Sequence, residues 1–374
     1  MQQNDNILKD TDRNGKDRKW RARKIASQNL AEAYRDVWIN DLIEEGWTPD
    51  EIDQFIPREY RFGYFNRSEK TDRCADILTF VRTEEGRLKL YQAWFCRDRL
   101  CNMCNWCRSM KFAVQVSELL KTMQDRGIKA KPIFATFTLR NVPGDEISKA
   151  ISHFSLSFQR IMKYKRCKAY CIGTIRTTEI TYSADADTWH VHIHCLIWMT
   201  PGYFRHGYIT QKEWRALWAK AARIDYDPWV DVKTVKPRKP TENDPTGMYK
   251  AVLEVCKYPI KPDAYTALTD PPEGETPEAK EDRLRRIRQL RDGLAHKRLI
   301  SFSGVLKQLR AELQLDDPED GDLIQTGEDQ EDQSPVVDVV VAQWDRTRRN
   351  YYTHDEQMKR EHMVDWHTEK GVRS

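Results

Sequence analysis

The middle of the chain carries the clearest pattern of hydrophobic and polar positions. Two segments, residues 145–164 and 210–223, repeat hydrophobic side chains at helical spacing, and Thr210 suits the N-cap of the second. Four other segments alternate or are rich in β-formers, which predicts strands: residues 133–140, 170–183, 188–199 and 228–236. The order β-α-β-β-α-β predicts an α+β fold with a ferredoxin-like antiparallel sheet and helices on one face.

The flanks of this region divide the chain further. We expect a helix over residues 20–46 and, after the sheet, helices over 246–257, in the basic segment 280–298 and from residue 303. Residues 336–344 predict a strand that could join an edge of the sheet or pair with the cysteine region. The expected parts are a basic arm and helical region (1–62), a cysteine region (63–112), the α+β domain (130–312), an acidic linker (313–335), and a C-terminal strand and tail (336–374).

Charge is segregated, although the 374-residue chain has a net charge of only +4. Residues 16–24 and 280–298 are basic, whereas residues 314–334 hold nine acids and no Lys or Arg. This distribution suits a polyanion-binding body with an acidic, poorly ordered segment, although solvated helix faces would give the same basic stretches. The chain has no membrane-length apolar run, and its first residues are polar. We therefore expect a soluble, cytoplasmic protein without a membrane partner.

A row of histidines marks the segment 188–199. His190, His192 and His194 share one face of this strand because side chains alternate across a sheet. If Ser183 pairs with Thr188, Glu179 on the preceding strand stands opposite His192. Two histidines and a carboxylate then form a three-ligand metal site with open positions for water or a phosphate oxygen. The alternative is a row of ordinary surface histidines.

Clustered cysteines form a second candidate site. In a chain without a secretory signal, they favour metal binding over disulfides. We expect a closed, structural zinc site made by Cys74, Cys96, Cys101 and Cys104, with Cys107 as the replacement if Cys74 lies too far away. A set of free buried thiols is the alternative.

A third candidate lies in the segment after residue 246. Glu254 and Tyr258 are four residues apart, which places both on one face of a helix, although Pro259 favours a helix end there. A tyrosine hydroxyl can attack a metal-polarised phosphate, and a nearby carboxylate can later activate water. Lys257 and Lys261 could hold a DNA backbone. Spacing alone does not select this tyrosine, since Tyr249 and Tyr265 are rivals.

Together these stretches resemble a known family, the rolling-circle plasmid replication initiators of the HUH endonuclease superfamily. FATFTLRNV is similar to the first family motif, and WHVHIHCLIWM to the His-hydrophobic-His motif, with His192 and His194 in the ligand positions. EVCKYPIK is similar to the single-tyrosine motif, and CRDRLCNMCNWCRS to the upstream cysteine-rich stretch. Cys107 stands where an arginine is common in the family. The resemblance covers roughly residues 70–325.

The resemblance implies a nicking domain over residues 130–312 and a mechanism. Tyr258 would cut the plus strand at the plasmid's double-strand origin and stay joined to the 5′ end, while the 3′ hydroxyl primes synthesis. Glu254 would support a second cleavage that ends replication. Mg or Mn would be held by His192 and His194, with Glu179 or His190 as third ligand. Origin DNA is the expected partner, together with a host helicase and DNA polymerase.

Other functions fit parts of this pattern. A mobilisation relaxase or a transposase of the same superfamily would share the site. A non-catalytic zinc protein that binds DNA and regulates transcription would use only the cysteine and basic segments. A metal-dependent small-molecule enzyme is also compatible with the histidines, although no cofactor loop is evident.

Overall fold

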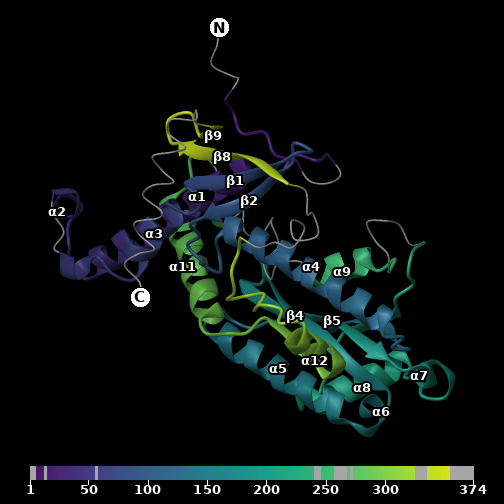
Figure 1. The fold of residues 1–374 in the computed structure, drawn as a ribbon. Helices are drawn as coiled ribbons and strands as arrows, with labels where there is room; N and C mark the ends of the chain where they lie inside the picture. Colours follow the sequence, from purple (N-terminus) through teal and green to yellow (C-terminus); the bar gives the residue numbers. More distant parts are fainter. Residues whose placement is uncertain are drawn as a thin grey trace. The chain divides into compact units, whose positions relative to one another are not determined.

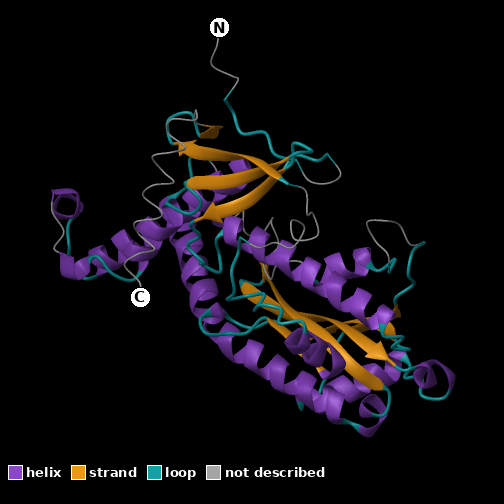
Figure 2. Ribbon diagram, in the orientation of Figure 1, coloured by secondary structure: helices purple, strands orange, loops and turns teal. Residues whose placement is uncertain are grey.

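The computed structural model describes residues 6–11, 15–54, 58–239, 246–256, 268–269, 273–324 and 335–353 (Figures 1 and 2). The chain divides into two compact units. Unit 1 comprises residues 1–107 and 322–374, and unit 2 comprises residues 108–321. Among the described residues, no helix is both long and apolar enough to span a membrane.

Unit 1 contains an antiparallel sheet with the strand order β2-β1-β8-β9. Its strands are β1 (Ile77–Thr83), β2 (Leu88–Ala93), β8 (Val336–Asp345) and β9 (Asn350–Thr353). Its helical segments are α1 (Trp20–Glu44), α2 (Pro49–Gln54), η1 (Arg58–Tyr60) and α3 (Tyr64–Asp72). The predicted C-terminal strand, β8, therefore pairs with β1 beside the cysteines and does not join the histidine sheet.

The N-terminal residues contribute to unit 1. Ile7 bridges to Tyr352, and the buried carboxylate of Asp10 accepts a hydrogen bond of 2.7 Å from the indole of Trp20. These contacts attach residues 6–11 of the expected basic arm to strand β9 and helix α1.

Unit 2 is built on an antiparallel sheet with the order β6-β3-β5-β4-β7. Its strands are β3 (Lys131–Thr138), β4 (Cys171–Ser183), β5 (Thr188–Met199), β6 (Val230–Thr234) and β7 (Ile300–Ser303). The order β6-β3-β5-β4 is the one that a ferredoxin-like β-α-β-β-α-β unit produces, so that prediction is confirmed. Strand β7, which the pattern did not predict, extends the sheet beyond β4.

The helices of unit 2 begin with α4, which starts in unit 1. The helical segments are α4 (Asn102–Asp125), η2 (Gly144–Glu146), α5 (Ile147–Lys163), α6 (Lys165–Lys168), α7 (Pro201–Arg205), α8 (Gln211–Ala222), α9 (Tyr249–Val255), α11 (Pro277–Leu294) and α12 (Gly304–Glu312). Thr210 caps α8 as predicted, because its hydroxyl accepts from the Glu213 amide and the Glu213 carboxylate accepts from the Thr210 amide.

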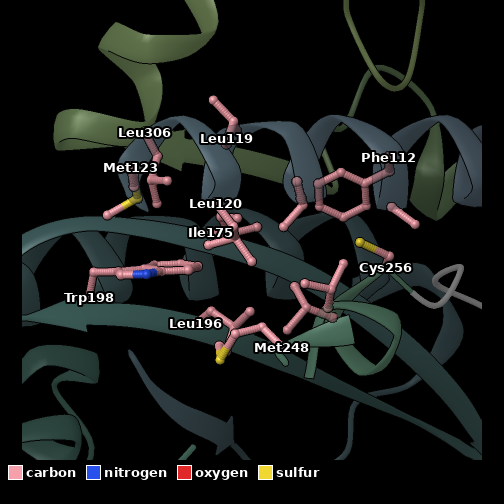
Figure 3. Close-up of a cluster of buried hydrophobic side chains, with 14 of the residues drawn as sticks. Phe112, Leu119, Leu120, Met123, Ile175, Leu196, Trp198, Met248, Cys256 and Leu306 are labelled. Atoms are coloured by element: carbon pink, nitrogen blue, oxygen red, sulfur yellow. The ribbon is translucent and has the colours of Figure 1, made fainter. Parts of the chain in front are cut away.

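Helices cover both faces of this sheet, not one (Figure 2). On one face, Phe137 of β3 packs its ring against Phe158 of α5 and Trp218 of α8. On the other, Leu196 and Trp198 of β5 join a buried cluster with residues of α4, α9 and α12 (Figure 3). The prediction of a single covered face fails because β5 is apolar on both faces beyond His194.

The acidic segment also differs from its prediction. Glu319 is buried, and its carboxylate accepts hydrogen bonds from the backbone amides of Leu299, at 2.9 Å, and Ile300. Lys111 of α4 forms an ion pair of 2.6 Å with Asp316. The expected poor order is therefore wrong for the part of this segment around Asp316 and Glu319, because their carboxylates satisfy buried donors of unit 2. Residues 325–334 lie outside the described residues.

We expect Glu319→Ala to destabilise unit 2. The substitution leaves two buried amides without an acceptor, each costing about 1–3 kcal/mol. Glu312→Ala is the control, because Glu312 makes an exposed ion pair of 2.6 Å with Arg126, and such pairs contribute about 0–1 kcal/mol. Urea unfolding of both variants checks this; equal losses of stability would contradict the role of Glu319.

Candidate functional site

The histidine site is built on the β4–β5 hairpin. Ser183 pairs with Thr188, and this register places Glu179 directly opposite His192. The predicted register is therefore confirmed. Glu179, His192 and His194 consequently project from the same face of the sheet.

These three side chains meet at one carboxylate oxygen. Oε2 of Glu179 lies 2.9 Å from Nε2 of His194 and 3.3 Å from Nε2 of His192. Ligand atoms of the three residues all lie within 4.8 Å of one another, and His190 is not part of this group. Nδ1 of His190 instead lies 2.9 Å from Oδ1 of Asn141. Of the two candidates for third ligand, the structure thus brings Glu179 to the histidine pair.

The site is more enclosed than the sequence suggested. Glu179 and His192 are each only 7% exposed, which speaks against the alternative of ordinary surface histidines. Burial alone would raise the pKa of Glu179, but its hydrogen bonds with His192 and His194 outweigh burial and hold that pKa well below its usual range. The carboxylate is therefore charged and able to bind a cation at neutral pH.

The donor set fits a small divalent cation. Adjacent ligands of an octahedral ion with bonds of about 2.1 Å lie about 3.0 Å apart. The two distances from Glu179 to the histidine nitrogens, 2.9 and 3.3 Å, match this spacing. Two imidazoles and one carboxylate would supply three ligands to such an ion and would leave its other positions for water or a substrate oxygen.

Strand β3 adds residues that the sequence had not singled out. Oγ1 of Thr136 lies 3.0 Å from Nδ1 of His194. The ring of Phe134 stacks on the same imidazole, with centroids 5.6 Å apart. The alternation of residues 133–140 places both side chains on one face, but sequence alone could not tell which strand they face.

The proposed nucleophile lies outside the described residues, as do Lys257, Lys261 and Tyr265. The chain before Tyr258 is helix α9, which contains Glu254 and begins at Tyr249. Val252 and Val255 pack in the same buried cluster as Leu196 of β5. Leu196 and His194 are two positions apart on β5, so both side chains project from the same face of the sheet. Helix α9 therefore covers the sheet face that carries the histidine site.

The cysteine cluster lies in unit 1. The structure brings together Cys74, between α3 and β1, Cys96, after β2, and Cys101 and Cys104 at the start of α4. Three sulfur–sulfur distances, 74–104, 96–104 and 74–101, are each 3.6 Å. A tetrahedral zinc with bonds of about 2.3 Å needs edges of about 3.8 Å, so the four sulfurs fit a zinc ion. Cys107 is buried but is not part of the group.

The environment of the sulfurs favours a thiolate. Burial alone would raise the pKa of Cys101, but hydrogen bonds from the other three thiols and from Ser27 hold it well below its usual range. Oγ of Ser27 lies 3.2 Å from the Cys101 sulfur. The buried ammonium of Lys24 donates a hydrogen bond of 2.8 Å to the carbonyl of Cys74. Helix α1 thus supports the cluster with a donor and a positive charge.

Both basic segments supply internal contacts. In addition to its hydrogen bond with the Cys74 carbonyl, Lys24 forms an ion pair of 2.5 Å with Asp76. The Lys24 ammonium is therefore not available to a polyanion. In α11, Arg283 is buried in an ion pair with Glu275 at 2.8 Å, and Arg286 pairs with Asp282 at 2.8 Å. Part of each basic run is therefore structural.

Comparison with known proteins identifies similar chains. Residues 87–352 match the family described as "Replication protein". A "Protein rep" of Streptococcus pneumoniae is 34% identical over 355 residues, which is 93% of this chain and 96% of that protein. One of Bacillus amyloliquefaciens is 36% identical over 92% of this chain and 96% of the relative. One of a Bacillus species is 41% identical over 70% of this chain and 85% of the relative. No solved structure matches the chain.

Proposed function

Because this chain belongs to the family of rolling-circle plasmid replication proteins, we propose that it starts replication by nicking one strand of the plasmid origin. The observation that carries the proposal is the buried group of Glu179, His192 and His194 on the central hairpin. A regulator that only binds DNA has no use for such a group. The relatives' names favour replication over mobilisation or transposition.

The residues of the nicking domain would have separate roles in the reaction. Glu179, His192 and His194 would hold Mg or Mn, which when bound polarises the scissile phosphate and stabilises its developing charge. The Tyr258 oxygen attacks phosphorus, the bond to the 3′ oxygen breaks, and that oxygen leaves as a hydroxyl after gaining a proton. The DNA 5′ end stays joined to Tyr258, and the free 3′ hydroxyl serves as primer.

The surroundings of the site suit this division. Helix α9 covers the sheet face that carries the histidines, and its last residues lead directly into the segment with Tyr258. Lys257 and Lys261, which flank the tyrosine in sequence, would contact phosphates. The four cysteines of unit 1 would hold a structural zinc. Origin DNA is the partner, a host helicase and polymerase would extend the nick, and the reaction would take place in the cytoplasm with the plasmid.

The proposal is tested with supercoiled plasmid carrying the cognate origin. The chain should convert it to nicked circles with Mg or Mn and leave it supercoiled in EDTA. A plasmid with a scrambled origin controls for unspecific cleavage. Intact supercoils in the presence of metal and cognate origin would reject the proposal.

Glu254→Ala should separate initiation from termination. Glu254 lies in α9, four residues before Tyr258, where its carboxylate would activate the nucleophile of the second cleavage. We expect a normal initial nick but at least about a tenfold loss of released single-stranded circles, since general-base catalysis contributes about 10²–10⁴-fold. Glu254→Asp should recover part of the release. A normal yield from the alanine variant would refute this role.

A further inference from the structure

Strand β3 borders the histidines on the side away from Glu179, because β5 lies between β3 and β4. Thr136 pairs with His194, and Thr138 pairs with His192. Directly opposite residues of an antiparallel pair project from the same face. Thr136 and Thr138 therefore project from the same face as the metal site, although the proposed chemistry gives strand β3 no task.

The hydroxyl of Thr136 contacts the ring of His194 at the nitrogen that faces away from Glu179. Oγ1 lies 3.0 Å from Nδ1, while Nε2 of the same ring lies 2.9 Å from Glu179 Oε2. Thr136 is only 6% exposed, so water competes poorly for this contact. The imidazole is thus held between a hydroxyl and a carboxylate.

This contact has a consequence for the protons of the ring. A neutral imidazole that offers the lone pair of Nε2 to a cation carries its proton on Nδ1. That N–H can donate to Oγ1 of Thr136, which accepts. The hydroxyl can therefore hold the ring of His194 in place while Nε2 binds a cation. A valine at this position would keep the shape but could not accept.

The two histidines are held differently. Phe134, two residues before Thr136, stacks on His194 with an angle of 29° between the ring planes. Nδ1 of His192 is buried and has no hydrogen-bond partner among the residues that the structure describes. Strand β3 therefore fixes the orientation of His194 and does not do the same for His192.

From these contacts we propose that Thr136 is a positioning residue, which fixes the orientation of His194 for a divalent cation and accepts a hydrogen bond from its Nδ1 when Nε2 binds that cation. The inference rests on the proposed function, because it assigns the ligand role to His194. It gives the conspicuous strand 133–140 a task in the site, namely to prepare one ligand before the cation binds.

The test measures Mn²⁺ binding to the zinc-loaded chain. Electron paramagnetic resonance monitors the signal of the Mn²⁺ that remains free. Thr136→Val should weaken Mn²⁺ binding about 10–100-fold, the usual effect of losing such a partner. Thr136→Ser keeps the hydroxyl and should bind as tightly as the unmodified chain. Thr138→Val is the matched control. The Thr138 hydroxyl donates its hydrogen bond, of 2.9 Å, to the carbonyl of Trp229 and not to a histidine.

Each outcome separates this inference from the proposed function. If Thr136→Val binds Mn²⁺ like the unmodified chain, the inference is overturned and the nicking proposal stands. Two further outcomes would also overturn the inference: Thr138→Val weakens Mn²⁺ binding as much as Thr136→Val does, or Thr136→Ser binds Mn²⁺ no better than Thr136→Val. Either result would mean that packing of the strand matters and the Thr136 hydroxyl does not. If the unmodified chain binds no better than His194→Ala, the site takes no metal, and both proposals fail.

Discussion

A chain carrying His194→Ala should nick origin DNA at least about 10³-fold more slowly than the unmodified chain. Metal polarisation of a phosphoryl oxygen supplies several kcal/mol of transition-state stabilisation, and each 1.36 kcal/mol is about a factor of ten in rate. Without His194, Glu179 and His192 remain as two donors on the hairpin. The rate is measured as the conversion of supercoiled to nicked circles at saturating Mn²⁺.

His190→Ala is the matched control for that experiment. His190 lies on the same strand and face, but its Nδ1 contacts Asn141 and it is outside the three-residue group. Its removal should leave the rate within about a few-fold of the unmodified chain. An equal loss in both variants would assign the third ligand position to His190, contrary to the geometry.

The second large effect is expected in unit 1. Cys101→Ser should release about one zinc per chain, because a four-thiolate site is closed and loses its geometry with one ligand. Structural zinc contributes on the order of 10 kcal/mol to the folding of small zinc domains. The variant should therefore also expose unit 1 to proteolysis, which mass spectrometry of the fragments can locate.

Cys107→Ser controls for the loss of any buried thiol. Cys107 is buried like Cys101, but it is not part of the four-sulfur group. Metal analysis should find an unchanged zinc content in this variant. A zinc-free Cys107→Ser chain would contradict the assignment, and so would full zinc retention by Cys101→Ser.

Short-range patterns predicted most of unit 2. The alternation in residues 170–183 and 188–199, with a four-residue connection, predicted the hairpin, and the register assumed for it places Glu179 opposite His192 as observed. The contact between Thr136 and His194 could not be predicted in this way, since the two residues are 58 positions apart. Their pairing depends on the order of strands in the sheet, which local spacing does not encode.

The remaining differences have physical causes of the same kind. Helix α4 covers the histidine-bearing sheet face, but its first turns hold cysteines that suggested a metal knuckle, so its apolar stripe was not recognised. Residues 336–344 predicted a strand that could join the sheet or pair with the cysteine region, and local spacing could not choose, because the actual partner, β1, is more than 250 residues earlier. The acids near residue 319 were expected in a poorly ordered segment, whereas one of them, Glu319, accepts hydrogen bonds from buried amides.

The most direct measurement is the site of covalent attachment after nicking. The chain is incubated with a single-stranded oligonucleotide that spans the origin nick site, in Mn²⁺, and the protein–DNA adduct is digested for mass spectrometry. The account predicts a 5′-phosphate on Tyr258 and no adduct from Tyr258→Phe, whose metal binding should be unchanged. An adduct on Tyr249 or Tyr265, or cleavage without any adduct, would contradict it.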